Sequence, residues 1–411
     1  MGGRWKNMSE INKLKIEILK PTDFITAKGK FRRDEAIEFS GLVAGECYDK
    51  EGFNHIVQEP DSKTQNRVNL TIGNGHHSVN DHVKITLNMH NIPKIIAMVL
   101  NDERDYATSE KSARYTPVER VEGSAITEDE ERLYKKWLGI LEPIIKERYG
   151  KVLKDNKIHK LAQENARYMV TVFMPTEMIH TISFRQINYI ASFMQKYISE
   201  VDKNDQFQVR VAEAMQEFIN ELARLNILEE RLMRNEKHRS LLLFGKNIDK
   251  KEVYFGDVYS TKYDGSFAQL AQAQRHRSLR YQMEMYPEDE KKYYVPEIIA
   301  NDKSLSEEWL GDINSVKQVN PQGEQVKIFE SGCYEDFILK SKERLCSAAQ
   351  LEIMKQTLLT MKEYEKALTA KDHYLAEDIQ KYMHGARCTF PDFDCTQCCN
   401  FNEGITLQRK I

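Results

Sequence analysis

The sequence lacks long apolar runs and lacks an excess of positive charge, and each absence argues against a class of protein. No segment of the 411 residues approaches the roughly 20 consecutive apolar residues of a membrane-spanning helix. The 60 lysines and arginines are outnumbered by 63 aspartates and glutamates, which gives a formal net charge of -3. General nucleic-acid binders depend on an excess of basic residues, so this charge argues against that class.

Cysteine is also scarce, and no secretion signal is evident. The seven cysteines form an odd number, which fits a reducing cytoplasm better than a disulfide framework. The first residues lack the apolar core of a signal peptide, so we expect a cytoplasmic protein. The length predicts about two domains. The 41% hydrophobic and 30% charged residues are typical of a globular protein.

A basic segment that begins at Gln272 is the most informative stretch of the chain. Residues 267–273 are small or favour helices, so they predict a short helix. The helix is followed by Arg275, His276 and Arg277. Guanidinium groups suit planar or phosphorylated ligands, because their donors form a flat fork. A solvated basic helix end is the alternative interpretation.

Three histidines lie close together in the first half of the chain. His76, His77 and His82 accompany a glycine turn, and the alternating residues 83–89 then predict a strand. Such a group could bind a metal ion or could form hydrogen bonds at the turn. Neighbouring side chains of a strand point to opposite faces, which favours hydrogen bonding.

A candidate phosphate site follows a helix expected at 92–100. Ser112 and Arg114 combine a hydroxyl with a guanidinium two residues away, a pair that can hold a phosphate. Asp102 and Glu103 precede them, and their carboxylates would repel a phosphate. The first half therefore carries only part of an anion-binding site.

These motifs together resemble the flavin-dependent thymidylate synthases, the ThyX family. The strongest likeness is Gln272 followed by Arg-His-Arg at 275–277, because this loop of the family holds the flavin and part of the deoxyuridylate. The segment that contains His76 and Ser78 resembles the family's Gly-His-x-Ser/Thr motif, whose histidine and hydroxyl lie against the flavin. Arg344 stands eight residues before Glu352, where the family has an arginine that contacts the uracil ring.

The resemblance implies roles for residues of both halves. Arg344 would be the catalytic residue, because its contact with the base favours loss of the N3 proton. The residues implied to bind the nucleotide are Glu110, Ser112, Arg114, Arg167, Gln272, Arg275 and Arg344. The residues implied to bind the flavin are His76, Ser78, Glu110, Arg185, Arg275, His276 and Arg277.

Each half departs from the family pattern at different positions. In the first half, Asp102 and Glu103 replace an arginine and a histidine, and Ser183 replaces an asparagine. Glu200 stands where the uracil-binding arginine is expected. In the second half, Met285 stands where the phosphate-binding serine is expected. The missing parts are complementary, and sites of the family are assembled between the subunits of a homotetramer.

We therefore expect an α/β (α+β) fold of two tandem ThyX-like repeats, each a central sheet packed with long helices. Apolar spacing from 206 to about 233 predicts one of these helices. The expected ranges are 1–235 for the first repeat with the phosphate half-site, 236–370 for the second with the Arg-His-Arg half-site, and 371–411 for a cysteine-rich tail. A chain would hold one composite site, or a homodimer would hold two and act as a pseudo-tetramer.

The implied reaction is reductive methylation of deoxyuridylate (dUMP) at C5. Methylenetetrahydrofolate would give the carbon, and reduced FAD, recharged by NADPH, would give the hydride. Two alternatives stay open. The protein could methylate or hydroxymethylate another pyrimidine deoxynucleotide, such as dCMP, or it could bind nucleotide or flavin without catalysis.

The tail has a signal of its own that the resemblance does not cover. His384 and four cysteines fall within sixteen residues. A Cys-x6-Cys-x2-Cys pattern with an upstream histidine is a candidate structural zinc site, because a short loop is hard to order without a cross-link. The alternative is a group of reduced, unliganded thiols. The candidate ligands are His384, Cys388, Cys395 and Cys398.

Overall fold

The computed structural model describes residues 13–20, 22–112, 117–120, 125–234, 236, 237, 239–391, 393–396, 399 and 401–411. The chain forms two compact units. Unit 1 contains Met1–Lys111 and Pro175–Leu241, and unit 2 contains Ser112–Met174 and Leu242–Ile411. These units differ from the expected ranges, because residues 112–174 pack with the second part of the chain and the tail is part of unit 2.

Unit 1 is built on a four-stranded antiparallel sheet in the order β1–β2–β4–β3. Residues Ile85, Leu87 and Met89 alternate along the second strand and are fully buried, so one face of the sheet forms the core. The strands are β1 (Lys15–Ile18), β2 (Lys84–Pro93), β3 (Tyr106–Glu110) and β4 (Pro175–Ser183).

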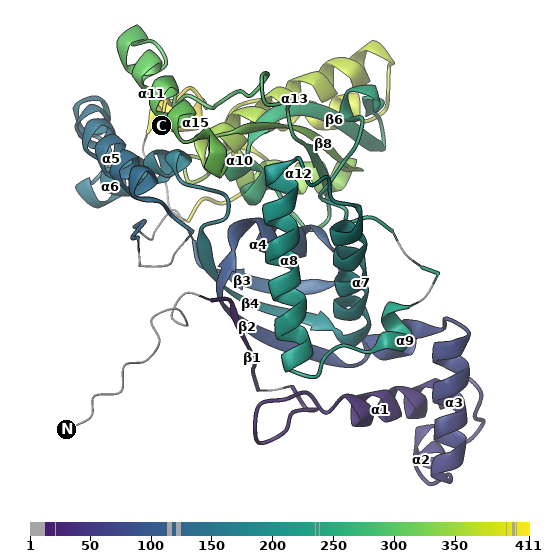
Figure 1. The fold of residues 1–411 in the computed structure, drawn as a ribbon. Helices are drawn as coiled ribbons and strands as arrows, with labels where there is room; N and C mark the ends of the chain where they lie inside the picture. Colours follow the sequence, from purple (N-terminus) through teal and green to yellow (C-terminus); the bar gives the residue numbers. More distant parts are fainter. Residues whose placement is uncertain are drawn as a thin grey trace, which may run out of the picture. The chain divides into compact units, whose positions relative to one another are not determined.

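Three helices pack on this sheet, as Figure 1 shows. Ser183 starts one of them, because its Oγ accepts a hydrogen bond from the backbone N–H of Gln186. The three are α4 (Lys94–Asp102), α7 (Phe184–Glu200) and α8 (Gln206–Arg224). The remaining helices of unit 1 are α1 (Arg33–Gly45), α2 (Phe53–Ile56), α3 (Asp61–Gly73), the 3-10 helix η2 (His77–Asp81) and α9 (Glu230–Met233).

Unit 2 has a second four-stranded antiparallel sheet, in the order β5–β6–β8–β7. The strands are β5 (Tyr254–Phe255), β6 (Val258–Ser266), β7 (Arg280–Glu284) and β8 (Gln325–Cys333). Helices α10 (Phe267–Ala273), α12 (Tyr334–Arg344) and α13 (Leu351–Ala370) accompany this sheet. The expected α/β (α+β) fold, with sheets packed by helices, is therefore confirmed.

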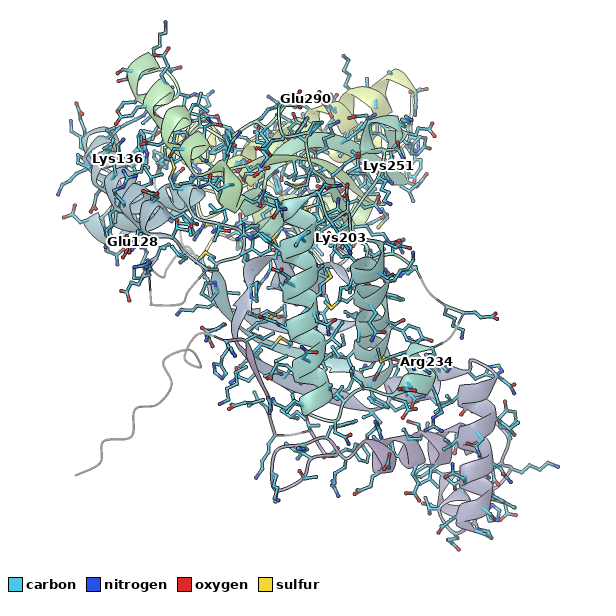
Figure 2. All side chains as sticks on the ribbon, in the orientation of Figure 1. Glu128, Lys136, Lys203, Arg234, Lys251 and Glu290 are labelled. Carbon is cyan, nitrogen blue, oxygen red and sulfur yellow. The ribbon has the colours of Figure 1, made fainter. Side chains whose placement is uncertain are left out.

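A separate helical layer completes the core of unit 2. Trp137 and Trp309 pack edge to face with ring centroids 4.8 Å apart and are fully buried. Beside them, Lys136 (Figure 2) forms ion pairs of 2.5 Å with Asp312 and 2.6 Å with Glu308. None of the described helices has both the length and the apolar character of a membrane span. The helices of this layer are α5 (Glu128–Tyr149), α6 (Asp155–Ala166) and α11 (Lys303–Ser315).

The two sheets share one order of elements along the chain. In unit 1 the order is β2, α4, β3, β4, α7 and α8. In unit 2 the corresponding order is β6, α10, β7, β8, α12 and α13. β4 begins at Pro175 and β8 at Gln325, and the helices that follow them begin at Phe184 and Tyr334. The two helix starts are the same number of residues apart as the two strand starts.

The turns that precede β4 and β8 pair with each other inside unit 2. Thr171 and Pro321 form an antiparallel bridge. They are the same number of residues apart as the starts of β4 and β8. On either side of it, the N–H of Gln322 donates to Val170 O at 2.8 Å and the N–H of Val172 donates to Asn320 O at 2.9 Å. The pairing brings Arg167–Met169 into unit 2.

Candidate functional site

Helix α10 positions the Arg-His-Arg segment. Ser266 caps the helix by accepting a hydrogen bond of 3.1 Å from the backbone N–H of Gln269. The helix ends at Ala273, and the following turn places His276 in the interior while Arg275 and Arg277 stay exposed. The segment therefore presents two exposed guanidinium groups on either side of a buried imidazole.

Arg344 contacts this turn from the end of α12. Its Nε donates a hydrogen bond of 2.6 Å to Nε2 of His276, and its Nη2 donates one of 3.3 Å to the carbonyl oxygen of Gln272. Only 12% of the Arg344 side chain is exposed. The structure therefore brings together three residues that the sequence assigned to one site. We call Gln272, His276, Arg344 and Gln350 the Arg344 site.

His276 is neutral in this arrangement. Burial, together with the positive charges of Arg344 and Lys340, lowers the pKa of His276 to about 2. Since Nε2 accepts from Arg344, the proton of the neutral ring is on Nδ1. A protonated His276 would lose this acceptor and place a second cation against the guanidinium.

A buried ion pair lies one helical turn from Arg344. Nζ of Lys340 lies 2.8 and 2.6 Å from the two carboxylate oxygens of Glu330. The hydroxyls of Tyr259 and Tyr263 donate to the same two oxygens, each at 2.7 Å. Both oxygens of Glu330 are thus held by these groups, and the buried charges of Lys340 and Glu330 are paired with each other.

Tyr168 connects the Arg344 site to a second buried carboxylate. The N–H of Gln350 donates to Oε1 of Gln272 at 3.3 Å, and Nε2 of Gln350 donates to the hydroxyl of Tyr168 at 2.5 Å. That hydroxyl donates to Oε2 of Glu352 at 2.9 Å, and Ser266 donates to Glu352 from its N–H and its Oγ. Tyr168 comes from the first half of the sequence, and its partners come from the second.

Desolvation shifts the pKa of two groups in this network. Burial raises the pKa of Glu352, although the hydrogen bonds from Ser266 and Tyr168 oppose the change. Burial also raises the pKa of Tyr168 well above its usual value, so this hydroxyl keeps its proton. Sequence reasoning missed Tyr168, because no local motif marks it.

Glu110, in unit 1, is already paired. Its Oε1 lies 2.5 Å from Nζ of Lys94, and its Oε2 accepts a hydrogen bond of 3.3 Å from Nδ2 of Asn101. The side chain of Glu110 is only 2% exposed. A ligand could reach this carboxylate, which was expected to bind nucleotide and flavin, only after Lys94 moved.

Glu103 occupies the position at which the second half has His276. It is fully buried, and Arg239 binds it with both terminal nitrogens, one of them 3.2 Å from Oε1. The guanidinium of Arg239 lies 4.5 Å from the ring centroid of Phe193. In both halves, the middle residue of the segment that corresponds to Arg-His-Arg is buried and contacts an arginine. The pairing with Arg239 therefore explains the carboxylate at position 103.

The glycine-turn segment forms another hydrogen-bonded group in unit 1. His76 and Ser78 are exposed, whereas His77 is buried, with Nδ1 2.7 Å from the hydroxyl of Tyr189. Asp81 accepts a hydrogen bond from Ser183 and pairs with Arg185, each at 2.6 Å. Burial lowers the pKa of His77, consistent with a neutral, hydrogen-bonded histidine.

The remaining residues that were expected to bind nucleotide or metal lie in different parts of the chain. Arg114 and Cys398 lie outside the described residues. Ser112 is partly buried at the first position of unit 2. Arg167 is buried beside Tyr134; burial raises the pKa of that tyrosine, and the charge of Arg167 opposes the change.

Metal-ligating atoms of the described residues gather within 4.8 Å only at Asp49, His55 and Glu59. Nδ1 of His55 lies 2.9 Å from Oδ2 of Asp49. Glu59 forms ion pairs with Lys63 and Arg67, so its charge is already balanced. This group is therefore explained as a network of ion pairs.

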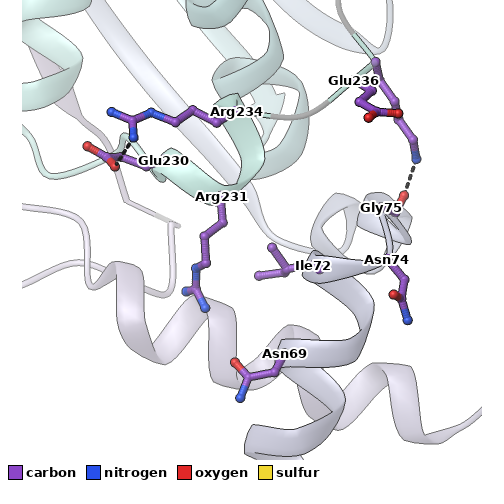
Figure 3. Close-up of a pocket in the computed structure, with 10 residues that line it drawn as sticks. Asn69, Ile72, Asn74, Gly75, Glu230, Arg231, Arg234 and Glu236 are labelled. Carbon is purple, nitrogen blue, oxygen red and sulfur yellow. Dashed lines mark hydrogen bonds and ion pairs between the residues drawn. The ribbon is translucent and has the colours of Figure 1, made fainter.

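A groove of unit 1 lies beside the glycine turn. It has a volume of about 720 Å³ and lies next to Gly75 at the end of α3 (Figure 3). Arg231 pairs with Glu229 at 2.7 Å, and Arg234 pairs with Glu230 at 3.4 Å. Because these arginines are paired, the groove has no strong preference for an anion.

One comparison with known proteins gives a match. Residues 35–223 match the family model described as thymidylate synthase complementing protein. The matched range includes β2, α4, β3 and β4 of the first sheet and ends before the second sheet begins. The comparison with curated proteins gives no match.

Proposed function

We propose, from the match of residues 35–223 to the thymidylate synthase complementing protein family, that this chain methylates deoxyuridylate at C5 in a flavin-dependent reaction. The family implies a thymidylate synthase-like enzyme, in general kind a methyltransferase. The observation that carries the finer proposal is the contact of Arg344 with His276 and Gln272. This contact holds the Arg344 guanidinium against the turn that carries the exposed Arg275 and Arg277.

The charge of Arg344 suits a uracil ring. Methylation at C5 requires the ring to become electron-rich, and loss of the N3 proton would do this. A guanidinium beside O2 and N3 stabilises the resulting negative charge, most strongly where water is excluded. Neutral His276 holds Arg344 in place without adding a competing cation. Cytosine has no N3 proton to lose, so the same arrangement favours deoxyuridylate.

Segments of both halves support one site within unit 2. Tyr168 precedes the turn that pairs with 320–322, and its hydroxyl bonds Gln350 and Glu352. The common order of elements in the two sheets supports an origin by tandem duplication. We propose that a composite site arose when the two copies lost different parts.

The residues of unit 2 fit a flavin. Exposed Arg275 and Arg277 supply planar cationic donors, which suit the diphosphate of FAD and the polar edge of its ring. When bound, reduced FAD supplies the hydride, with NADPH as its reductant and methylenetetrahydrofolate as the carbon donor. His276 keeps the turn between the two arginines packed. Glu110 and Arg185 are engaged in ion pairs and add no support.

The test is identification of the nucleotide product. The full chain is incubated with FAD, NADPH and methylenetetrahydrofolate, with deoxyuridylate and deoxycytidylate in separate reactions, and the nucleotides are analysed by mass spectrometry. Thymidylate is the expected product. Arg344→Met should abolish it, whereas Arg280→Met, which changes an exposed arginine on β7, should not.

Other outcomes would replace the proposal. A methylated or hydroxymethylated deoxycytidylate would assign the site to another pyrimidine nucleotide. Binding of flavin without any product would make the protein a nucleotide- or flavin-binding protein. We also propose that the chain forms a homodimer that acts as a pseudo-tetramer, and light scattering at several concentrations tests this; a monomer at every concentration would contradict it.

A further inference from the structure

The first residues of α13 hold both ends of the short helix α10. At the start of α10, the N–H and the Oγ of Ser266 donate to the two carboxylate oxygens of Glu352, at 2.8 and 2.6 Å. At the other end, the N–H of Gln350 donates to Oε1 of Gln272 at 3.3 Å. α10 has only seven residues, so these contacts fix its first and last turns. We call Gln350 and Glu352 the α10 anchor.

Ser266 connects the cap of α10 to this anchor. Its Oγ accepts the hydrogen bond that starts the helix, from the backbone N–H of Gln269, and donates its own O–H to Glu352. A hydroxyl can do both, because it has one donor and two acceptor lone pairs. Ser266 is fully buried, so water is not available to replace these bonds. A movement of Glu352 would therefore disturb the start of α10.

The end of α10 is held through its backbone and through a side chain. Nη2 of Arg344 donates to the carbonyl oxygen of Gln272, while the N–H of Gln350 donates to its side-chain oxygen. A backbone N–H can only donate, so Oε1 of Gln272 faces Gln350. The Arg-His-Arg turn at 275–277 follows α10, so the position of this helix sets the position of the turn.

One hydroxyl, that of Tyr168, contacts both residues of the α10 anchor. It accepts a hydrogen bond of 2.5 Å from Nε2 of Gln350 and donates one of 2.9 Å to Oε2 of Glu352. Tyr168 is 1% exposed, and its ring packs against Tyr294 and Trp309 with centroids 4.8 and 6.4 Å away. Packing therefore fixes the ring, and the hydroxyl fixes the two anchor residues relative to each other.

We propose that Tyr168 is a positioning residue of the Arg344 site. Through the α10 anchor, its hydroxyl fixes both ends of α10 and thereby the place of Gln272 and of the turn at 275–277. Tyr168 acts through these contacts and not on a ligand. For turnover, this inference rests on the proposed function. For the position of α10, it rests only on the hydrogen bonds of the α10 anchor.

The first test measures amide hydrogen exchange of the full chain without any substrate. Tyr168→Phe keeps the ring and removes the hydroxyl, so the amides of α10 and of residues 274–277 should exchange about tenfold faster or more. Their acceleration should exceed that of α5 and α11 in the same unit. Tyr293→Phe is the matched control and should leave the exchange of α10 unchanged, because the Tyr293 hydroxyl has no hydrogen-bond partner among the described residues.

Two outcomes of this test would overturn the proposal. Unchanged exchange of α10 in Tyr168→Phe would show that the hydroxyl does not hold the helix. Equal acceleration throughout unit 2 would show a general loss of stability in place of a local one.

The second test separates positioning from stability by kinetics. At a temperature where circular dichroism shows that all variants are folded, Tyr168→Phe should lower kcat/KM for deoxyuridylate by about tenfold or more, since small displacements in a site can cost as much as about 100-fold. Tyr293→Phe should keep the wild-type value. A wild-type kcat/KM in folded Tyr168→Phe would overturn the positioning role. A wild-type chain that forms no thymidylate, with faster exchange of α10 in Tyr168→Phe, would contradict the proposed function and still support the positioning of α10.

A double variant tests whether Tyr168 acts through Gln350. Gln350→Leu removes the side-chain amide that donates to Tyr168 and keeps the N–H that donates to Gln272. If both residues act along one path, adding Gln350→Leu to Tyr168→Phe should accelerate the exchange of α10 by less than Gln350→Leu does alone. Full addition of the two effects would overturn this path.

Discussion

Replacement of Tyr168 by phenylalanine tests the network that joins the two halves of the sequence. The substitution keeps the ring, which packs against Tyr294 with centroids 4.8 Å apart, and removes only the hydroxyl. Nε2 of Gln350 loses its acceptor, and Glu352 loses one of its donors. Leaving buried polar groups unsatisfied costs about 1–3 kcal/mol. A loss of ~2 kcal/mol lowers the melting temperature by about 4–8 °C in a unit of this size.

The effect of this substitution should depend on pH. Burial raises the pKa of Glu352 above its ordinary value of 4.5, and the Tyr168 hydroxyl opposes that rise. A carboxyl group with a raised folded-state pKa gives its full stability below pH 4.5, and this stability is lost as pH rises through the folded pKa. Tyr168→Phe raises that pKa further. The loss of stability should therefore be larger at neutral pH than at acidic pH.

The assay is thermal and urea unfolding, followed by circular dichroism across this pH range. Tyr293→Phe is the matched control, because the Tyr293 hydroxyl has no hydrogen-bond partner among the described residues. That control should leave stability unchanged or raise it, because it removes a buried hydroxyl that has no partner to lose. Equal unfolding curves for the two variants at every pH would refute the network.

Substitutions of His276, Lys340 and Arg239 test the remaining polar contacts. His276→Gln should keep most activity, because an amide oxygen can accept from Arg344, whereas His276→Lys should lose about 100-fold or more in kcat. Activity that falls below pH 6.5 through protonation of His276 would contradict its pKa of about 2. Lys340→Met should destabilise the fold by about 3–5 kcal/mol, because Glu330 keeps a buried charge, and a double variant with Glu330→Gln should recover part of that loss in urea unfolding. Arg239→Met should be similarly destabilising in unit 1, since Glu103 is fully buried; wild-type stability in either case would refute the pairing.

Local patterns predicted several elements well. The helix expected at 267–273 is α10, and the alternating residues 83–89 lie in β2. The helix expected from 206 to about 233 was too long: α8 ends at Arg224, and Asn226 has a left-handed backbone with φ of 62°. Periodicity continues past this break, because the next apolar residues are also buried, so the pattern alone did not reveal the end of the helix.

The residues brought together by tertiary structure were harder to predict. The motif led correctly to Gln272, His276 and Arg344 as neighbours, because it records a known arrangement. It gave no sign of Tyr168, which joins the Arg344 site through contacts distant in sequence. Those contacts depend on the pairing of the turns at 170–172 and 320–322, which has no local sequence signal.

Release of deuterium from C5 of deoxyuridylate tests the central claim most directly. Methylation at C5 must break the C5–H bond, so labelled deoxyuridylate, incubated with the full chain, FAD, NADPH and methylenetetrahydrofolate, should lose one deuteron to water for each thymidylate formed. Arg344→Met should slow this release by about 100- to 1,000-fold if the guanidinium stabilises the charged ring. Retention of the label by deoxyuridylate, or faster release from labelled deoxycytidylate, would contradict the assignment of the Arg344 site to uracil methylation.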